Sequence, residues 1–365
     1  MKKFTSILLF MVLILTSSFS FKVIMVTDAG GLGDKSFNDG TWEGVQMAVR
    51  EFEGVEGEVI ISKEQTDYLS NLSRAAQNGD LVVGVGFLMS DVLFSVATQY
   101  PDTYFIGIDI EPSPGQIIPG NLALYTFKEE EAGFLLGYIA ASMSKTNKVG
   151  FIGGLEIPPV KRYEIGYKSG VKAYNDIKGK KVEVITGYVG SFTDAGKTKQ
   201  IALSQYNLGA DIVFTGVTTG AVIDAAKEKG SSFYELPMNA SLQQIIDKYY
   251  EKGMGYFVIG YDMDQDFMAP GYVLTSSRKK VDVATFEGIS SAIFDRVFQS
   301  GHHVLGIADD AVGLSQMKYT KGMVPNEAVA ELAYLQKLVK DKEISIPNNE
   351  SSLNIFNVSH ITFPF

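Results

Sequence analysis

The chain has 365 residues, a formal net charge of −10 and no cysteine, and 45% of its residues are hydrophobic. Its length and apolar content suffice for two domains, and its acidity argues against nucleic acid or an anionic membrane surface as a partner. Without cysteine, a disulfide framework, a thiolate metal site, a cysteine nucleophile and an N-terminal lipid-modified cysteine are excluded.

The N-terminal segment 1–20 has the pattern of a secretory signal peptide. Two lysines follow Met1, an almost unbroken apolar run covers 7–15, and small residues flank Phe19 at a cleavage site. The apolar run is too short to span a membrane. We therefore expect cleavage after Ser20 and a mature protein outside the inner membrane; the alternative is an uncleaved anchor.

Short apolar, β-branched runs alternate with helix-patterned stretches along the rest of the chain. This alternation predicts an α/β fold, because parallel strands covered by helices on both faces are apolar throughout. It begins again after a helix-like stretch at 129–143, which predicts a second α/β unit. The expected strands lie at 23–26, 59–61, 81–85, 104–108, 149–152, 182–185, 212–214, 257–259 and 272–274.

No long linker separates the two units, so we expect two closely packed lobes with short crossings near 121–128, 255–262 and 301–306. Ligands of open α/β sheets bind beyond the carboxyl ends of the strands, which predicts a cleft between the lobes. The expected organisation is a signal peptide over 1–20, a first lobe of 21–125 and 262–303, and a second lobe of 126–261 and 304–365.

The segment 27–40 follows the first strand and predicts a ligand-binding loop. Its glycines at 30, 31 and 33 permit unusual backbone angles, and Asp28, Phe37 and Asn38 offer an acid, an aromatic ring and an amide. A phosphate loop is disfavoured, because Asp34 stands where a Walker motif needs glycine and a dinucleotide turn lacks its third glycine. The alternative is a solvated turn that caps a helix.

Further residues stand at strand ends or loops where a ligand is expected. Asp109 and Asp262 close apolar strands, Phe192 precedes a predicted helix start at Thr193 or Asp194, and the run 278–280 offers cationic donors, one of which can neutralise the acids. Phe37 and Phe192 can sandwich a planar ring, while carboxylates accept hydrogen bonds from hydroxyls. The alternatives are core packing for the rings, turn or capping roles for the acids and solvated charge for the cations.

The sequence contains little that indicates a catalytic site. Asp262 and Asp264 form a pair of acids, but the histidines at 302, 303 and 360 have no zincin spacing, and no Gly-x-Ser-x-Gly elbow is present. We interpret His302 and His303 as a loop pair, because adjacent side chains diverge. We expect neither enzymatic activity, nor a metal, nor a cofactor.

At these motifs the sequence resembles the basic membrane protein family of periplasmic-binding-protein-like receptors, which includes purine nucleoside receptors. The resemblance extends over nearly the whole mature chain. The matching blocks are 27–31 with 34–38, 105–109, 150–154 leading to 164–167, 190–194, 262–265 and 274–282, of which the first and last are the most specific.

The resemblance implies a type I periplasmic binding protein fold, with two doubly wound lobes that close on a purine nucleoside. It implies that Phe37 and Phe192 stack on the base, and that Asn38 and Asp109 contact its polar edge. Asp28, Asp262 and Lys279 then hold the ribose or close the site.

The chain departs from the family in two places. Where the family has a Gly-Gly-Thr-Gly loop, residues 215–220 form a loop one residue shorter, in which Gly216 is the best candidate for backbone contacts. The lipidation cysteine is also missing, which implies a freely diffusing periplasmic receptor without a lipid anchor.

The leading hypothesis is a substrate-binding protein that delivers a purine nucleoside to an ABC permease in the inner membrane. One alternative is a receptor for a sugar or another small polar metabolite. The other is a secreted nucleoside hydrolase that uses Asp28, Asp34 and Asp262 around calcium.

Overall fold

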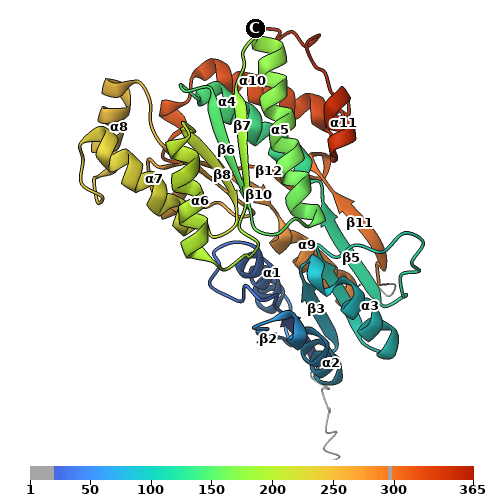
Figure 1. Ribbon diagram of the computed structural model, residues 1–365. Helices are drawn as coiled ribbons and strands as arrows, with labels where there is room; N and C mark the ends of the chain where they lie inside the picture. The colour runs from blue at the N-terminus through green and yellow to red at the C-terminus, as the bar shows by residue number, and fades with distance from the viewer. Residues whose placement is uncertain (1–19, 295–297) are drawn as a thin grey trace, which may run out of the picture.

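Two six-stranded sheets organise residues 20–294 and 298–365, which the computed structural model describes. Each sheet forms the centre of one lobe, and the two lobes are stacked with the carboxyl ends of their parallel strands toward each other (Figure 1). The α/β fold expected from the sequence is confirmed. The expected signal peptide lies almost entirely outside the described residues.

The sheet of the first lobe is parallel throughout its described pairings. Its strand order is β11-β5-β4-β3-β1-β2, so the N-terminal strand lies inside the sheet. The strands are β1 (Phe21–Val26), β2 (Val55–Ile60), β3 (Leu81–Val85), β4 (Tyr104–Ile108), β5 (Leu122–Phe127) and β11 (Gly301–Leu305).

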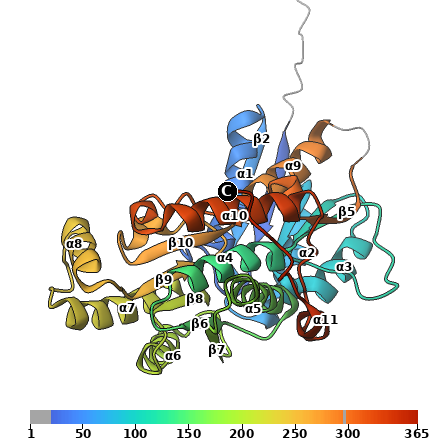
Figure 2. The same cartoon turned by 90° about the horizontal axis from the view of Figure 1, so that it is seen from above.

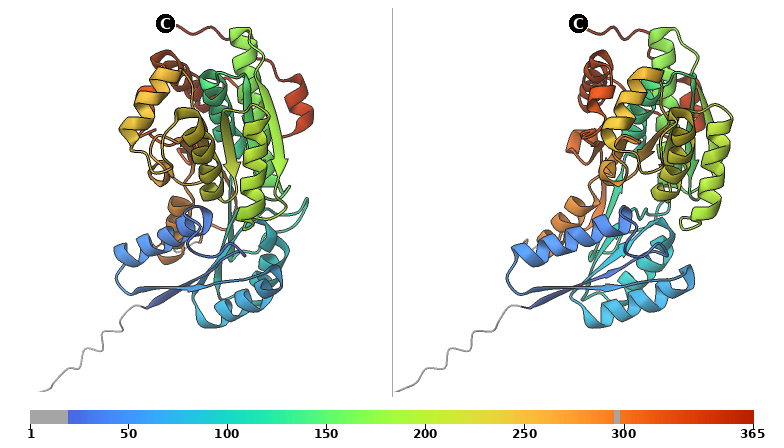
Figure 3. Two further views of the ribbon diagram at one scale, coloured as in Figure 1. Left: turned by 60° about the vertical axis from the view of Figure 1, so that its left-hand side comes forward. Right: turned by 90° about the vertical axis from the view of Figure 1, so that its left-hand side faces the viewer.

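Helices cover both faces of this sheet, as its apolar strands require. On one face, α1 and α9 pack against each other and against the strands; α2 and α3 pack on the other face. Figure 3 shows α1 at the top of the first lobe, facing the second. The helices are α1 (Phe37–Glu51), α2 (Tyr68–Asn78), α3 (Ser90–Gln99) and α9 (Val281–Phe294).

The second sheet has the order β12-β10-β9-β8-β6-β7 and is parallel except for the antiparallel pair of β10 and β12. Its helices again flank the strands, and α10 lies alongside α4 (Figure 2). The strands are β6 (Lys148–Gly153), β7 (Glu183–Tyr188), β8 (Ile212–Gly216), β9 (Phe257–Gly260), β10 (Val273–Lys279) and β12 (Val312–Leu314). The helices are α4 (Glu129–Met143), α5 (Pro158–Lys178), α6 (Ala195–Asn207), α7 (Thr219–Tyr234), α8 (Leu242–Lys252), α10 (Asn326–Lys340) and α11 (Glu350–Ile355).

The helices α4 and α5 approach unusually closely through glycines. A Cβ atom on Gly137 would lie 2.0 Å from the carbonyl oxygen of Tyr167, and one on Gly170 would lie 1.9 Å from that of Phe134. Such distances are below any van der Waals contact, so only glycine permits this packing. The contact fixes the first turns of both helices, which face the other lobe.

The chain crosses between the lobes at three places, after β5, after β10 and after β11. The first and third agree with the sequence expectation, but the second does not. Residues 262–279 were expected in the first lobe, whereas β10 belongs to the second sheet. The reason is that its polar half, from Thr275 onward, is buried and bonded to neighbours such as Ser315, so a strand continues where the apolar run ends.

The sequence analysis also missed three strands, β5, β11 and β12. The interpretation of His302 and His303 as a loop pair was wrong, because both lie in β11, at the edge of the first sheet. His302 Nε2 lies 2.7 Å from Thr126 Oγ1 of the adjacent strand, and the ring of His303 stacks on Tyr125. β11 alternates half-buried and exposed residues and β12 has only three residues, so neither forms the apolar run by which other strands were recognised. β5 is buried throughout, but its segment had been interpreted as a crossing between the lobes.

Candidate functional site

A cavity between the lobes brings together all eight residues predicted to form the site. Asp28, Phe37 and Asn38 line it from the first-lobe loop, together with Asp109 at the end of β4. From the second lobe come Phe192, Gly216, Asp262 and Lys279. Gly30 and Asp34 of the predicted loop also line the cavity. The sequence did not single out the other lining residues, which are Gly86, Phe87, Leu88, Ile157, Pro159, Val160, Tyr163 and Tyr261.

Asn38 is buried at the start of α1 and holds two carboxylates in place. Its Nδ2 donates to Asp28 Oδ1 (2.8 Å) and to Asp34 Oδ2 (3.1 Å), while its Oδ1 accepts from the backbone N–H of Asp28 (3.2 Å). Both amide hydrogens are thereby engaged, which leaves one lone pair of Oδ1 for a ligand. Burial raises the pKa of Asp28 and of Asp34 above the ordinary value, against these hydrogen bonds.

Asp34 shapes the loop rather than presenting a free carboxylate. Its two oxygens accept the backbone N–H groups of Ser36, Asn38 and Asp39 at 2.8–3.1 Å. The first N–H groups of a helix have no partner within it, so an acid at this position caps α1. The loop 27–40 therefore both caps α1 and lines the cavity. It can be a helix-capping turn and a ligand-binding loop at the same time.

Phe37 and Phe192 enter the cavity from opposite lobes. Phe37 begins α1, and the ammonium group of Lys279 lies 5.2 Å from the centre of its ring. The ring of Phe192 packs on Gly154, where a Cβ atom would come within 2.4 Å of it. Asp194 caps α6 by accepting from the N–H of Lys197, so the predicted helix start near Phe192 is confirmed.

Asp262 follows β9 and is buried with a left-handed backbone at φ 61°. Its Oδ1 accepts from the hydroxyl of Tyr163 (3.0 Å), which also lies 2.6 Å from Ser277 Oγ. Burial raises the pKa of Asp262, while Lys279 and Tyr163 oppose this effect. Its Oδ2 accepts no hydrogen bond from the described residues, so it can accept one from a ligand.

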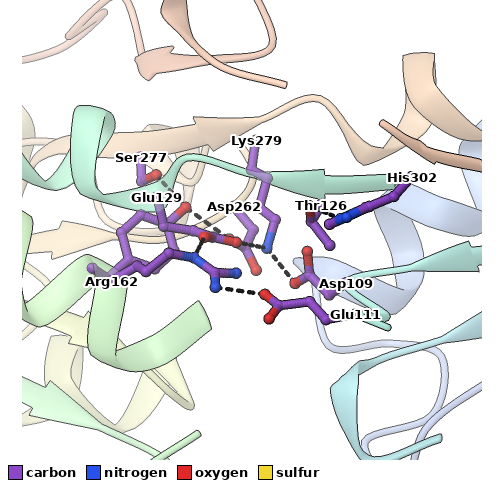
Figure 4. Close-up of polar contacts among 10 residues, drawn as sticks. Asp109, Glu111, Thr126, Glu129, Arg162, Asp262, Ser277, Lys279 and His302 are labelled. Atoms are coloured by element: carbon purple, nitrogen blue, oxygen red, sulfur yellow. Dashed lines mark hydrogen bonds and ion pairs between the residues drawn. The ribbon is translucent and has the colours of Figure 1, made fainter. Parts of the chain in front are cut away.

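Asp109 and Lys279 form an ion pair from opposite lobes (Figure 4). Lys279 Nζ donates to Asp109 Oδ2 and lies 2.8 Å from Glu129 Oε1. Asp109 Oδ1 is buried without a hydrogen-bond partner among the described residues. Burial raises the pKa of Asp109 to about 7 despite the nearby ammonium group.

Glu129 and Arg162 are functional candidates that the sequence analysis did not find. Glu129 is fully buried at the first position of α4, and its Oε2 accepts from Arg162 Nε (2.6 Å). Burial alone would raise the pKa of Glu129, but Lys279 and Arg162 outweigh it and lower the pKa. A run of three glutamates at a helix start is typical of solvated charge, and no local signal shows that Glu129 and Glu130 are buried.

Gly216 ends β8 and borders the cavity beside the shortened loop. A Cβ atom there would have only the carbonyl oxygen of Ile152 within 4 Å, at 3.8 Å, so protein packing does not require glycine. Thr215 Oγ1 donates to the carbonyl oxygen of Val217 and stabilises the turn. Backbone contact between Gly216 and a ligand stays a prediction.

Comparison with known proteins agrees with this geometry. Over residues 21–350 the chain matches the family described as ABC transporter substrate-binding protein PnrA-like. Basic membrane protein A of Borreliella afzelii is 32% identical over 340 residues, which cover 92% of this chain and 94% of that protein. The CD4+ T-cell-stimulating antigen of Listeria monocytogenes is 30% identical over 346 residues, which cover 91% and 89% of the two chains. A crystal structure of an ABC transporter solute-binding protein from Aeropyrum pernix K1 has a TM-score of 0.78 at 26% identity and covers 92% of this chain and 95% of its own.

The chain belongs to the basic membrane protein family of ABC transporter substrate-binding proteins. The resemblance inferred from the sequence motifs is therefore confirmed. Membership implies a small-molecule ligand and a transporter permease as partner, and the family and the Aeropyrum pernix structure are described as solute-binding proteins rather than enzymes. Within the described residues, no helix is both long and apolar enough to cross a membrane.

The calcium-dependent hydrolase alternative finds no donor set in this family member. Among residues 20–294 and 298–365, no three His, Asp or Glu side chains are grouped so that they could hold a metal ion. Asp34, one of the three proposed ligands, already accepts three backbone N–H groups. The acids of the cavity are therefore better placed to accept hydrogen bonds from an organic ligand.

Proposed function

We propose that this protein is a periplasmic receptor that binds a purine nucleoside between its two lobes and delivers it to an ABC permease in the inner membrane. The observation that carries the proposal is the pairing of Phe37 and Phe192, one from each lobe, on a cavity rich in carboxylates. A planar heterocycle between two rings gains contact with both lobes at once. Such a ligand favours closure of the cleft.

The charge of the cavity supports a neutral ligand with many hydrogen-bond donors. Its walls carry four aspartates and one lysine, and that lysine is already bound to Asp109 and Glu129. Carboxylates accept hydrogen bonds from ribose hydroxyls and from ring N–H groups. The same charges repel phosphate, so a nucleotide is excluded where its nucleoside fits.

Three carboxylates have an oxygen without a hydrogen-bond partner among the described residues. Asp109 Oδ1 has none, Asp262 engages only Oδ1, through Tyr163, and Asp28 accepts only through Oδ1, from Gly30 and Asn38. We assign Asp262, with Asp28, to the ribose and Asp109, with the free lone pair of Asn38, to the edge of the base. A sugar alone would use the acids but leave the two phenyl faces without a planar partner.

Ligand identity and catalysis are tested with the same purified protein. Ligand that co-purifies with the protein, released by denaturation and identified by mass spectrometry, should be a purine nucleoside. Calorimetry should then show binding of inosine or guanosine, no binding of the matching 5′-monophosphate, and no free base after prolonged incubation. A hexose as the released ligand, or equal affinity for the monophosphate, contradicts the proposal.

A further inference from the structure

The two lobes carry opposite charges just outside the cavity, on groups that do not line it. Arg162 Nη1, from the first turns of α5 in the second lobe, donates to Glu111 Oε1 at 2.5 Å (Figure 4). Glu111 follows β4 in the first lobe. The side chains of Arg162 and Glu111 are 16% and 27% exposed, so the pair is partly shielded from water.

Glu129 holds the cations of the second lobe toward the first. It is fully buried in the second lobe and pairs with both Arg162 and Lys279, at 2.6 and 2.8 Å. These bonds do not cross the cleft, so they persist when the lobes separate. Arg162 and Lys279 of the second lobe then face Glu111 and Asp109 of the first and attract them across the cleft, while Asp262, also of the second lobe, repels Asp109.

Two ion pairs connect the lobes, Lys279–Asp109 and Arg162–Glu111, and only one of them can be removed without changing the ligand site. Lys279 lies where the chain crosses between lobes and it lines the cavity, so its replacement also alters the ligand site. Arg162 and Glu111 lie outside the cavity, and among the described residues Glu111 forms an ion pair with Arg162 alone. The Glu111–Arg162 pair is therefore the contact that can act on closure without touching the ligand.

From this arrangement we propose that the Glu111–Arg162 ion pair is a latch that keeps the two lobes closed and slows release of the bound solute. Arg162 and Glu111 are positioning residues, because they do not contact the ligand and affect it only by holding the two lobes together. The inference rests on the proposed function only for the choice of ligand. A latch of this kind lengthens the lifetime of the closed state and leaves the first encounter of ligand and protein unchanged.

The test uses Glu111→Gln, because it removes the charge from the more exposed partner and leaves buried Glu129 compensated by Arg162. Glu156→Gln is the matched control: it removes the exposed Glu156–Lys161 pair, at 3.6 Å, which lies within the second lobe. The native chain contains no cysteine, so Ser95→Cys on α3 and Ser204→Cys on α6, both exposed and on different lobes, accept a dye pair that reports closure.

In stopped-flow measurements with inosine as probe, Glu111→Gln should release ligand about three- to tenfold faster than wild type, a range suited to a partly exposed pair. The association rate and the unfolding temperature should stay the same, Glu156→Gln should match wild type, and Glu111→Asp, which keeps the charge, should lie between. Unchanged release from a folded Glu111→Gln protein overturns the latch.

The ligand-free labelled proteins provide a second, independent measurement. Glu111→Gln should spend less time in the closed, high-transfer state than wild type, and equal distributions in the two proteins contradict the latch. If inosine closes neither protein, the nucleoside proposal fails. The closed fractions of the two ligand-free proteins then decide by themselves whether the Glu111–Arg162 pair is a latch.

Discussion

At the scale of single residues, the site depends on carboxylates that the fold keeps from water. Asp262 occupies a left-handed backbone conformation at φ 61°, which asparagine tolerates better than most residues. Asparagine also retains an oxygen that can accept from Tyr163. Asp262→Asn is therefore a change of charge with little effect on the backbone.

We expect Asp262→Asn to weaken nucleoside binding by about 1.5–3 kcal/mol, because hydrogen bonds to a charged acceptor are lost. Binding of the 2′,3′-dideoxy analogue should change less, since it lacks the hydroxyls assigned to this carboxylate. Calorimetry with both ligands on both proteins measures the difference. Equal losses of affinity for the two ligands would show that Asp262 does not bind the ribose hydroxyls.

The raised pKa of Asp109 makes ligand binding depend on pH. A ligand N–H that donates to Asp109 needs the ionised carboxylate, which predominates above the pKa of about 7. Affinity should therefore rise from about pH 6 to about pH 8, and binding should release protons near the pKa. Lys279, Glu129 and Asp262 face the same group and set this pKa.

Calorimetry in two buffers of different ionisation enthalpy measures the proton release. Asp109→Asn should remove both the release and the pH dependence. Proton uptake on binding by the wild type would show that Asp109 donates a proton to the ligand instead.

Phe192→Ala should weaken binding by about 1–3 kcal/mol, through loss of one ring face and its buried area. Phe267, 58% exposed and outside the cavity, offers a control, because Phe267→Ala removes the same side chain without touching the ligand. Affinities from calorimetry, together with unfolding temperatures, check both. Unchanged affinity in a folded Phe192→Ala protein would mean that Phe192 packs in the core and does not contact the ligand.

At the scale of elements, the contact of α4 and α5 positions Glu129, Arg162 and Tyr163 at the cleft. Gly170→Ala should lower the free energy of unfolding by about 1–3 kcal/mol, because the methyl group meets the backbone of α4 at 1.9 Å. In an open helix the same change is stabilising. Gly220→Ala in α7, where no atom lies within 4 Å of the new methyl group, is the control and should not destabilise.

Denaturant titrations of the two glycine variants measure this difference. If Gly170→Ala is as stable as Gly220→Ala, the helices can separate without cost, and the close approach does not hold the site.

At the scale of the whole molecule, the two lobes share a continuous core. One cluster of buried apolar residues spans both lobes and includes Val83 and Ile108 of the first sheet and Val213 and Val258 of the second. A second, smaller cluster lies within the first lobe. Three chain crossings join the lobes in addition. We therefore expect one cooperative unfolding transition for both lobes.

Inosine at a concentration 100-fold above its dissociation constant should stabilise the folded protein by about 2.7 kcal/mol, the gain from binding to the native state alone. Since the ligand contacts both lobes, calorimetric scans should show the whole transition moving to higher temperature. Two transitions, of which only one moves with inosine, would mean that the ligand binds to a single lobe.

The sequence by itself determined most of the inner strands and the loops that follow them. Strands such as β3 and β4 are buried on both faces, so each is an apolar run, and Asp109, which follows β4, lines the cavity. The same logic placed Asp28 and Asp262. Asp109 and Lys279 lie 170 positions apart and meet in an ion pair.

Only the tertiary structure decided which strands complete each sheet and which charges are buried. Short edge strands such as β11 and β12 take their conformation from a neighbouring strand, and the polar half of β10 takes its from Ser315. Glu129 is singled out from its neighbouring glutamates by Arg162, 33 positions away, and by Lys279. Partners this distant leave no local pattern, because burial of a charge is settled only when the lobes pack together.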